Sequence, residues 1–112
     1  MTHIKQKQVI KNESLAEFTQ GIKILYFWSP QCQHCKTTQT PILEKTCINN
    51  AIKLDIEKIN INDNSSKVTS WGVRTVPTIY ILDRFRNIAY INNGLTSEIK
   101  LMKQLRSINM SD

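Results

Sequence analysis

The chain has 112 residues, of which 40% are hydrophobic, and a formal net charge of +6. This length suits one compact domain, which we expect to span residues 1–112, and the scattered basic residues argue against a nucleic-acid surface. No apolar run is long enough to span a membrane. Because the N-terminus lacks the apolar core of a signal peptide, we expect a cytoplasmic protein, or a periplasmic or other extracytoplasmic one if a leader has been removed.

Strands and helices are predicted to alternate along the first half of the chain. In chain order, the predicted elements are a strand at 4–10, a helix at 14–21, a strand at 22–28, a helix at 32–49, a strand at 52–61, a helix at 63–72, strands at 78–82 and 88–91, and a helix at 96–108. The short connection between the last two strands makes them an antiparallel pair. The order β-α-β-α-β-α-β-β-α therefore predicts an α/β fold with a mixed sheet.

Residue types at the helix ends and on the helix faces refine this prediction. Helix N-caps are expected at Ser14, at Asp63 or Asn64, and at Thr96. Pro41 lies inside the second helix and should bend it, because proline has no backbone N–H to donate. The inward face of the last helix is predicted to carry Ile99, Met102, Leu105 and Ile108.

The chemistry of the chain is concentrated in a C-x-x-C motif, Cys32-Gln33-His34-Cys35, which directly follows the buried strand. At a helix N-terminus the free N–H groups and the helix dipole lower the pKa of a thiol, which makes Cys32 the expected nucleophile. Cys35 lies one turn deeper and is expected to resolve the mixed disulfide. His34, as a cation, would further stabilise the Cys32 thiolate.

Other uses of the cysteines are weighed against this one. Half of a zinc site also has the form C-x-x-C, but no second Cys/His pair follows at metal-ligand spacing, so we expect no metal. The third cysteine, Cys47, is interpreted as a small core residue; the alternative is a regulatory thiol that could link two chains.

Several short motifs together carry a family resemblance. They are Phe27-Trp28, Cys32-Gln33-His34-Cys35-Lys36, Pro41, Thr75-Val76-Pro77-Thr78 and Gly94. With these motifs the chain resembles the thioredoxins across nearly its whole length. The resemblance implies a thioredoxin fold, with a central mixed sheet of about five strands flanked by about four helices.

The resemblance also implies a client-binding surface and a set of partners. Pro77 is expected to be cis and to face the disulfide, while the backbone of Val76 binds an extended client peptide by β-augmentation. Trp28 is expected to pack beside the active site. The implied redox centre is the Cys32–Cys35 disulfide without a bound cofactor. The implied partners are client proteins with disulfides and a flavin-dependent thioredoxin reductase as electron donor, and the chain is expected to be a monomer.

Among the departures from the pattern of ordinary thioredoxins, two bear on the redox chemistry. His34 is similar to the residue found in protein disulfide isomerases and in the periplasmic disulfide oxidant, where it favours the reduced form. Tyr26 occupies the position of a buried aspartate that is thought to handle the proton of Cys35. The usual lysine partner is matched by Lys58, which leaves Lys58, with Glu57 or water, as the candidates for proton handling.

Three functions are therefore considered. The first is a protein thiol–disulfide oxidoreductase of the reductase type, favoured by the motif and the expected cytoplasmic location. The second is a disulfide oxidant or isomerase, favoured by His34. The third belongs to another class: a client-binding module that uses the edge at Val76 and Pro77 and does not need redox activity.

Overall fold

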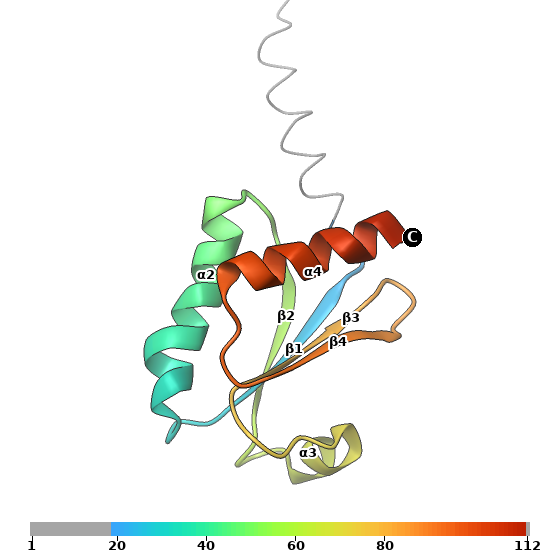
Figure 1. Ribbon diagram of the computed structural model, residues 1–112. Helices are drawn as coiled ribbons and strands as arrows, with labels where there is room; N and C mark the ends of the chain where they lie inside the picture. The colour runs from blue at the N-terminus through green and yellow to red at the C-terminus, as the bar shows by residue number, and fades with distance from the viewer. Residues whose placement is uncertain (1–18, 112) are drawn as a thin grey trace, which may run out of the picture.

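The structure, a computed structural model, describes residues 19–111 (Figure 1). The predicted strand at 4–10 and the predicted helix cap at Ser14 lie outside the described residues. From residue 22 onward, the described elements follow the predicted order of strands and helices. No helix in this part of the chain has the length and apolar character needed to cross a membrane.

Within the described residues, a four-stranded mixed sheet forms the centre of the fold, in the order β2-β1-β3-β4. Its strands are β1 (Lys23–Trp28), β2 (Asp55–Asn60), β3 (Thr78–Leu82) and β4 (Ile88–Asn93). Strand β1 pairs in parallel with β2 and antiparallel with β3, and β3 pairs antiparallel with β4. The predicted mixed sheet and its C-terminal hairpin are confirmed, and β1 is the predicted central strand, because its four inner residues are buried.

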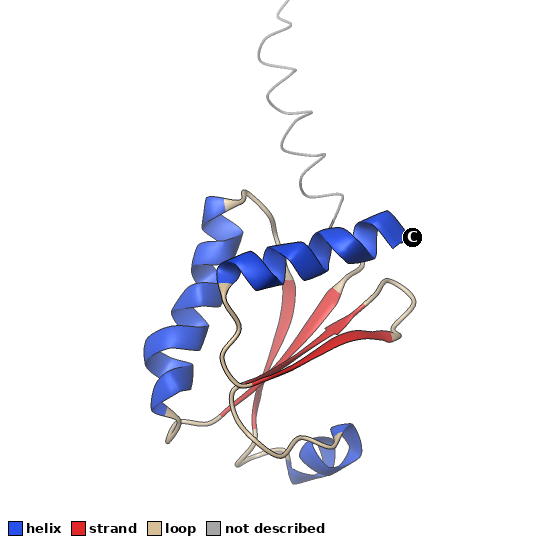
Figure 2. Ribbon diagram, viewed as in Figure 1, coloured by secondary structure: helices blue, strands red, loops and turns tan. Residues whose placement is uncertain are grey.

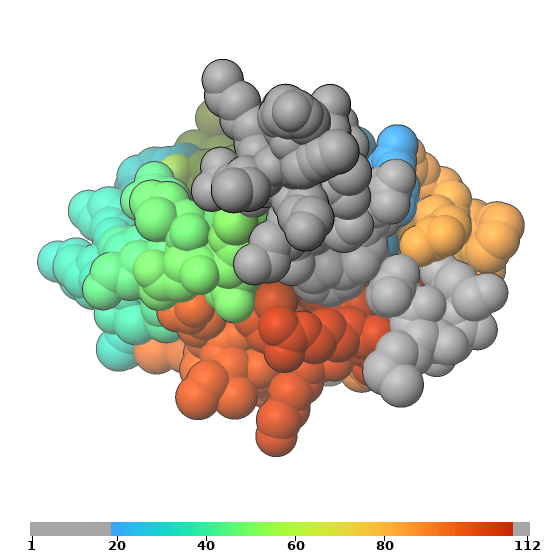
Figure 3. All heavy atoms as spheres, turned by 90° about the horizontal axis from the view of Figure 1, so that it is seen from above, coloured from blue at the N-terminus to red at the C-terminus, as the bar shows by residue number. Residues whose placement is uncertain are grey.

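The helices cover both faces of the sheet (Figure 2). They are α2 (Thr40–Asn49), which continues from a π-helical turn η1 (Cys35–Gln39), α3 (Ser65–Trp71) and α4 (Glu98–Ser111). One core cluster joins α2 and α4 to the face of the sheet that carries Tyr26, and the other joins α3 to the opposite face, around Phe27 and Tyr80. Helices α2 and α4 also pack against each other (Figure 3).

The predicted helix at 32–49 contains an irregularity where a bend was expected. The turn η1 precedes Pro41, and the backbone N–H of Thr40 donates to the carbonyl of Cys35, five residues back. Because Pro41 has no N–H, the regular ladder of hydrogen bonds is interrupted at the same place. A π-helical turn therefore connects the C-x-x-C motif to the regular helix, and such turns are common at functional sites.

Two of the predicted helix caps are wrong in detail. The side chain of Asn64 makes no cap hydrogen bond to α3; its amide donates to the carbonyl of Asn60 at 2.8 Å. At α4 the capping hydroxyl belongs to Ser97, which accepts the N–H of Lys100 at 3.2 Å. Thr96, one residue earlier, is buried instead, and its backbone N–H donates to the side chain of Gln39.

The predicted inward face of α4 is correct except at its first position. Met102, Leu105 and Ile108 are buried, but Ile99 is 72% exposed and the fully buried Leu101 occupies the core instead. Residues two apart on a helix lie about 200° apart around its axis, so Leu101 and Ile99 cannot both face the sheet. Burial of Leu101 therefore turns Ile99 outward.

Candidate functional site

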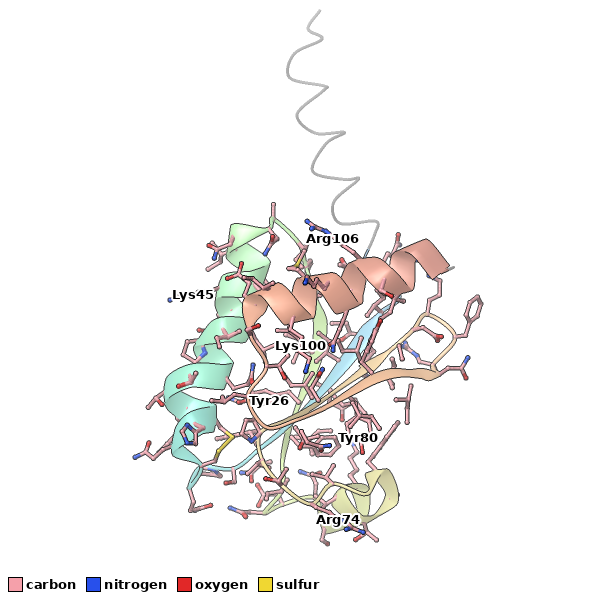
Figure 4. All side chains as sticks on the ribbon, in the orientation of Figure 1. Tyr26, Lys45, Arg74, Tyr80, Lys100 and Arg106 are labelled. Atoms are coloured by element: carbon pink, nitrogen blue, oxygen red, sulfur yellow. A yellow bond between two sulfur atoms is a disulfide. The ribbon has the colours of Figure 1, made fainter. Side chains whose placement is uncertain are left out.

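The two cysteines of the motif form a disulfide at the N-terminal end of the long helix (Figure 4). Their Cα atoms are 5.3 Å apart. The side chain of Cys35 is fully buried, whereas Cys32 is partly exposed. Cys32 follows β1 after a short loop and lies near the surface. Cys35, the first residue of η1, lies beneath it. Of the two cysteines, only Cys32 is therefore accessible from the surface.

The backbone around Cys32 is arranged to stabilise negative charge on its sulfur. The N–H of Cys35 donates to Cys32 Sγ at 3.1 Å, and the N–H of Lys36 donates to the Cys32 carbonyl at 3.2 Å. A backbone N–H at this distance and the positive end of the helix dipole would both stabilise a thiolate at this place. His34 is exposed in the first turn of the same helix, between the two cysteines.

The loop that precedes β3 lies at the same end of the sheet as the disulfide. Phe27 of β1 pairs with Thr78 of β3, so the residues just before Thr78 lie beside the end of β1 that leads into the motif. The Val76–Pro77 peptide bond is cis. Pro77 is buried and its carbonyl accepts the N–H of Gly94 at 2.8 Å, while Val76 remains partly exposed.

Trp28 and Lys58 lie together at the end of β1. The Lys58 ammonium is 4.1 Å from the centre of the Trp28 ring, within the range of a cation–π interaction. Beyond Trp28, the Asn62 side-chain amide donates to Gln31 Oε1 at 2.8 Å. This contact links the loop before Cys32 to the turn after β2, and nothing in the sequence pattern pointed to it.

Tyr26 of β1 lies in the core, and Figure 4 shows it between α2 and the strands of the sheet. Its hydroxyl donates to the carbonyl of Cys35 at 3.3 Å and lies 2.9 Å from Thr40 Oγ1. Burial raises the pKa of Tyr26 above its ordinary value, against a smaller opposite effect of the hydrogen bond from Thr40. Tyr26 is therefore a neutral hydroxyl group throughout the physiological pH range.

A groove of about 510 Å³ runs between α2 and β2 beside Tyr26. Its lining is mostly apolar and includes the free, partly buried thiol of Cys47. Lys58 also lines this groove. Cys47 thus lies at the edge of the core and not in its centre, where the sequence had suggested a packed residue.

Glu57 points away from this groove. It pairs with Lys23 at 3.2 Å and with Lys67 of α3, on the opposite face of the sheet from Lys58. The hydrogen bonds from Lys67 and Lys23 lower the pKa of Glu57 below its usual value. Adjacent residues of a strand face opposite sides, so Glu57 and Lys58 do not act on the same group.

Gln39 is a structural part of the site that sequence analysis missed. It is fully buried in η1, where its amide nitrogen donates to the carbonyl of Thr96 at 3.1 Å and its amide oxygen accepts the N–H of Thr96 at 2.8 Å. The π-helical turn is thus bound to the loop between β4 and α4. The only hint in the sequence is a glutamine without a charged neighbour, which is too weak a signal to interpret.

Comparison with known proteins places these features in a known context. A sequence model of the thioredoxin family matches residues 4–107. The chain is 34% identical over 67 residues to a thioredoxin of Bacillus subtilis, covering 60% of this chain and 64% of the relative. It is 33% identical over 66 residues to a thioredoxin of Haemophilus influenzae, covering 59% of this chain and 61% of the relative. The chain thus spans less than two thirds of the length of these relatives.

Solved structures show the same likeness. A thioredoxin from Thermosipho africanus superposes with a TM-score of 0.66 at 29% identity, covering 80% of this chain and 97% of that one. A thioredoxin variant from Halobacterium salinarum gives a TM-score of 0.69 at 20% identity, covering 84% of this chain and 80% of that one, and shows the shared fold. Among residues 19–111, no group of three or more His, Cys, Asp or Glu side chains is placed to hold a metal ion.

Proposed function

The chain belongs to the thioredoxin family, and on this premise we propose that it is a protein thiol–disulfide oxidoreductase that reduces the disulfides of client proteins. The observation that carries the proposal is the asymmetry of the Cys32–Cys35 pair. One sulfur is reachable and accepts a backbone N–H, and the other is fully buried beneath it. This arrangement suits a nucleophile and a resolving thiol acting in sequence.

The proposed reaction has two steps. The Cys32 thiolate attacks one sulfur of a client disulfide, which forms a mixed disulfide and releases the other client sulfur as a thiolate. The Cys35 thiolate then attacks Cys32 Sγ, which forms the Cys32–Cys35 bond and releases the second client sulfur with the electron pair. The client gains two electrons and the dithiol loses them. A protonated His34, which lies between the two cysteines in the chain, would favour the Cys32 thiolate.

The proposed client surface consists of Trp28, Val76 and Pro77. The pairing of β1 with β3 brings the loop of Val76 and Pro77 beside the end of β1, and Val76 is exposed enough to offer its backbone to an extended segment. Regeneration of the dithiol requires an electron donor, for which a thioredoxin reductase is proposed. A monomer in the cytoplasm suits this role, since thiols are kept reduced there.

The competing function is that of a disulfide oxidant or isomerase, and the exposed His34 in the first helical turn favours it. The midpoint potential of the Cys32–Cys35 couple in dithiothreitol or glutathione buffers separates the two. A reductase is expected at about −250 mV or below, near thioredoxin, and a value above about −190 mV would favour the oxidant or isomerase.

A client-binding module without essential redox activity is tested separately. In the proposed function, replacing both Cys32 and Cys35 by serine abolishes catalysed reduction of a synthetic peptide closed by one disulfide, with dithiothreitol as reductant. A protein that retained its full effect on the peptide after this double replacement would act by binding alone.

A further inference from the structure

The carbonyl of the resolving cysteine accepts two hydrogen bonds. One comes from the backbone N–H of Thr40, across the π-helical turn, and the other from the hydroxyl of Tyr26 at 3.3 Å. Tyr26 belongs to the central strand and is 1% exposed. A buried side chain of β1, which pairs with strands on both of its sides, therefore attaches the turn that carries Cys35 to the sheet.

The direction of the hydrogen bonds follows from the number of protons. Tyr26 has one hydroxyl proton, and it donates that proton to the Cys35 carbonyl, which has none to give. The contact of 2.9 Å between Tyr26 and Thr40 Oγ1 must then be donated by Thr40. The chain of donors runs from Thr40 to Tyr26 to Cys35, and both hydroxyls are satisfied.

We propose that Tyr26, held by Thr40, is a positioning residue for the resolving step: it fixes the turn of Cys35 in the conformation from which its sulfur reaches Cys32. This inference rests on the proposed oxidoreductase function. The contact is present with the Cys32–Cys35 disulfide formed, so it stabilises the conformation that the resolving step must produce.

Tyr26 acts in this proposal through the backbone and exchanges no proton with Cys35. Burial raises the pKa of its hydroxyl, which keeps it a donor at neutral and mildly alkaline pH. The titratable groups that face it across the groove are Glu44 and Cys47 of α2 and Lys58 of β2. In the resolving step the proton of the Cys35 thiol passes to water.

The test uses the reduced protein in a Cys47→Ser background, with dithiobis(nitrobenzoate) as the disulfide probe. Attack by Cys32 releases one thionitrobenzoate, and attack by Cys35 on the mixed disulfide releases the second, so two absorbance phases report the two steps separately. In the Tyr26→Phe protein the second phase is expected to slow about five- to tenfold, the effect of about one lost hydrogen bond, while the first phase is unchanged.

The pH profile separates positioning from proton transfer. Between about pH 6 and pH 9, we expect the rate of the second phase to change with pH around the same midpoint pH in the Tyr26→Phe protein as in the unmodified protein. The rate of the Tyr26→Phe protein should be lower by the same factor at every pH. A shifted or lost midpoint would show that Tyr26 takes part in proton transfer and would overturn the proposal. Equal second-phase rates, or equal slowing of both phases, would also overturn it.

Matched variants keep the result interpretable. Tyr80→Phe removes another buried tyrosine hydroxyl, which donates to the carbonyl of Trp71 on the opposite face of the sheet, and should leave both phases unchanged. Thr40→Val, which removes the hydroxyl that donates to Tyr26, should slow the second phase, whereas Thr40→Ser, which keeps a hydroxyl, should retain the rate of the unmodified protein. These two variants test the same hydrogen bonds if the Tyr26→Phe protein fails to fold. Absence of a second phase in the protein with Tyr26 intact would refute the proposed function itself.

Discussion

Gln39 gives the most direct test of how the C-x-x-C helix is held in place. Replacing it by leucine removes both hydrogen bonds to Thr96 and leaves a buried N–H and a buried carbonyl without these partners. An unsatisfied buried polar group costs about 1–3 kcal/mol, and partial access of water to the loop reduces the sum. We therefore expect Gln39→Leu to lower the free energy of unfolding by about 2–4 kcal/mol.

The assay is urea denaturation of the oxidised protein, followed by tryptophan fluorescence. With an m-value of about 2 kcal/mol/M, the expected loss moves the midpoint down by about 1–2 M. The control is Gln33→Leu, which changes an exposed glutamine of the same helix and should alter stability by less than about 0.5 kcal/mol. A loss for Gln39→Leu no larger than that of the control would refute the structural role given to Gln39.

Three further predictions concern stability. Leu105→Ala should cost about 2–5 kcal/mol in urea denaturation because Leu105 is fully buried, whereas Ile99→Ala on the same helix should change less than about 0.5 kcal/mol. Gly21→Ala should cost at least about 1 kcal/mol in thermal unfolding, since φ is +84° and the new Cβ would lie 2.9 Å from the Cβ of Arg84; an unchanged melting temperature would contradict this. Glu57→Gln should destabilise the protein at neutral pH. Because folding lowers the pKa of Glu57, the stability that its carboxylate contributes is present above the unfolded pKa and is lost as the pH falls through the folded pKa. The difference in stability between the unmodified protein and the Glu57→Gln protein should therefore shrink below about pH 4.3.

Much of the fold could be predicted because its signals are local. The apolar run at 22–28 and the alternation at 52–61 predicted the strands β1 and β2, and the C-x-x-C motif predicted the disulfide at the start of a helix. These patterns depend on neighbours in sequence and on the side-chain periods of strands and helices. The partial exposure of Cys32 and the burial of Cys35 followed from the placement of the motif at the start of a helix.

The remaining features depend on contacts between distant residues. The pairing of Gln39 with Thr96 joins positions 57 apart in the chain, and no local pattern announces it. The contact of Tyr26 with Cys35 and Thr40 requires knowing how η1 lies on β1. The outward position of Ile99 depends on which face of α4 the sheet selects, and its apolar character alone suggested the opposite.

The measurement that tests the central claim most directly is the trapping of a mixed disulfide, by mass spectrometry, with a synthetic peptide closed by one disulfide. In a Cys47→Ser background, reduced Cys35→Ser protein should accumulate a covalent adduct of one peptide per chain, joined through Cys32. Cys32→Ser protein should accumulate none, because the buried Cys35 cannot reach the peptide. An adduct formed by the Cys32→Ser protein, with none from the Cys35→Ser protein, would contradict the assignment of nucleophile and resolving thiol.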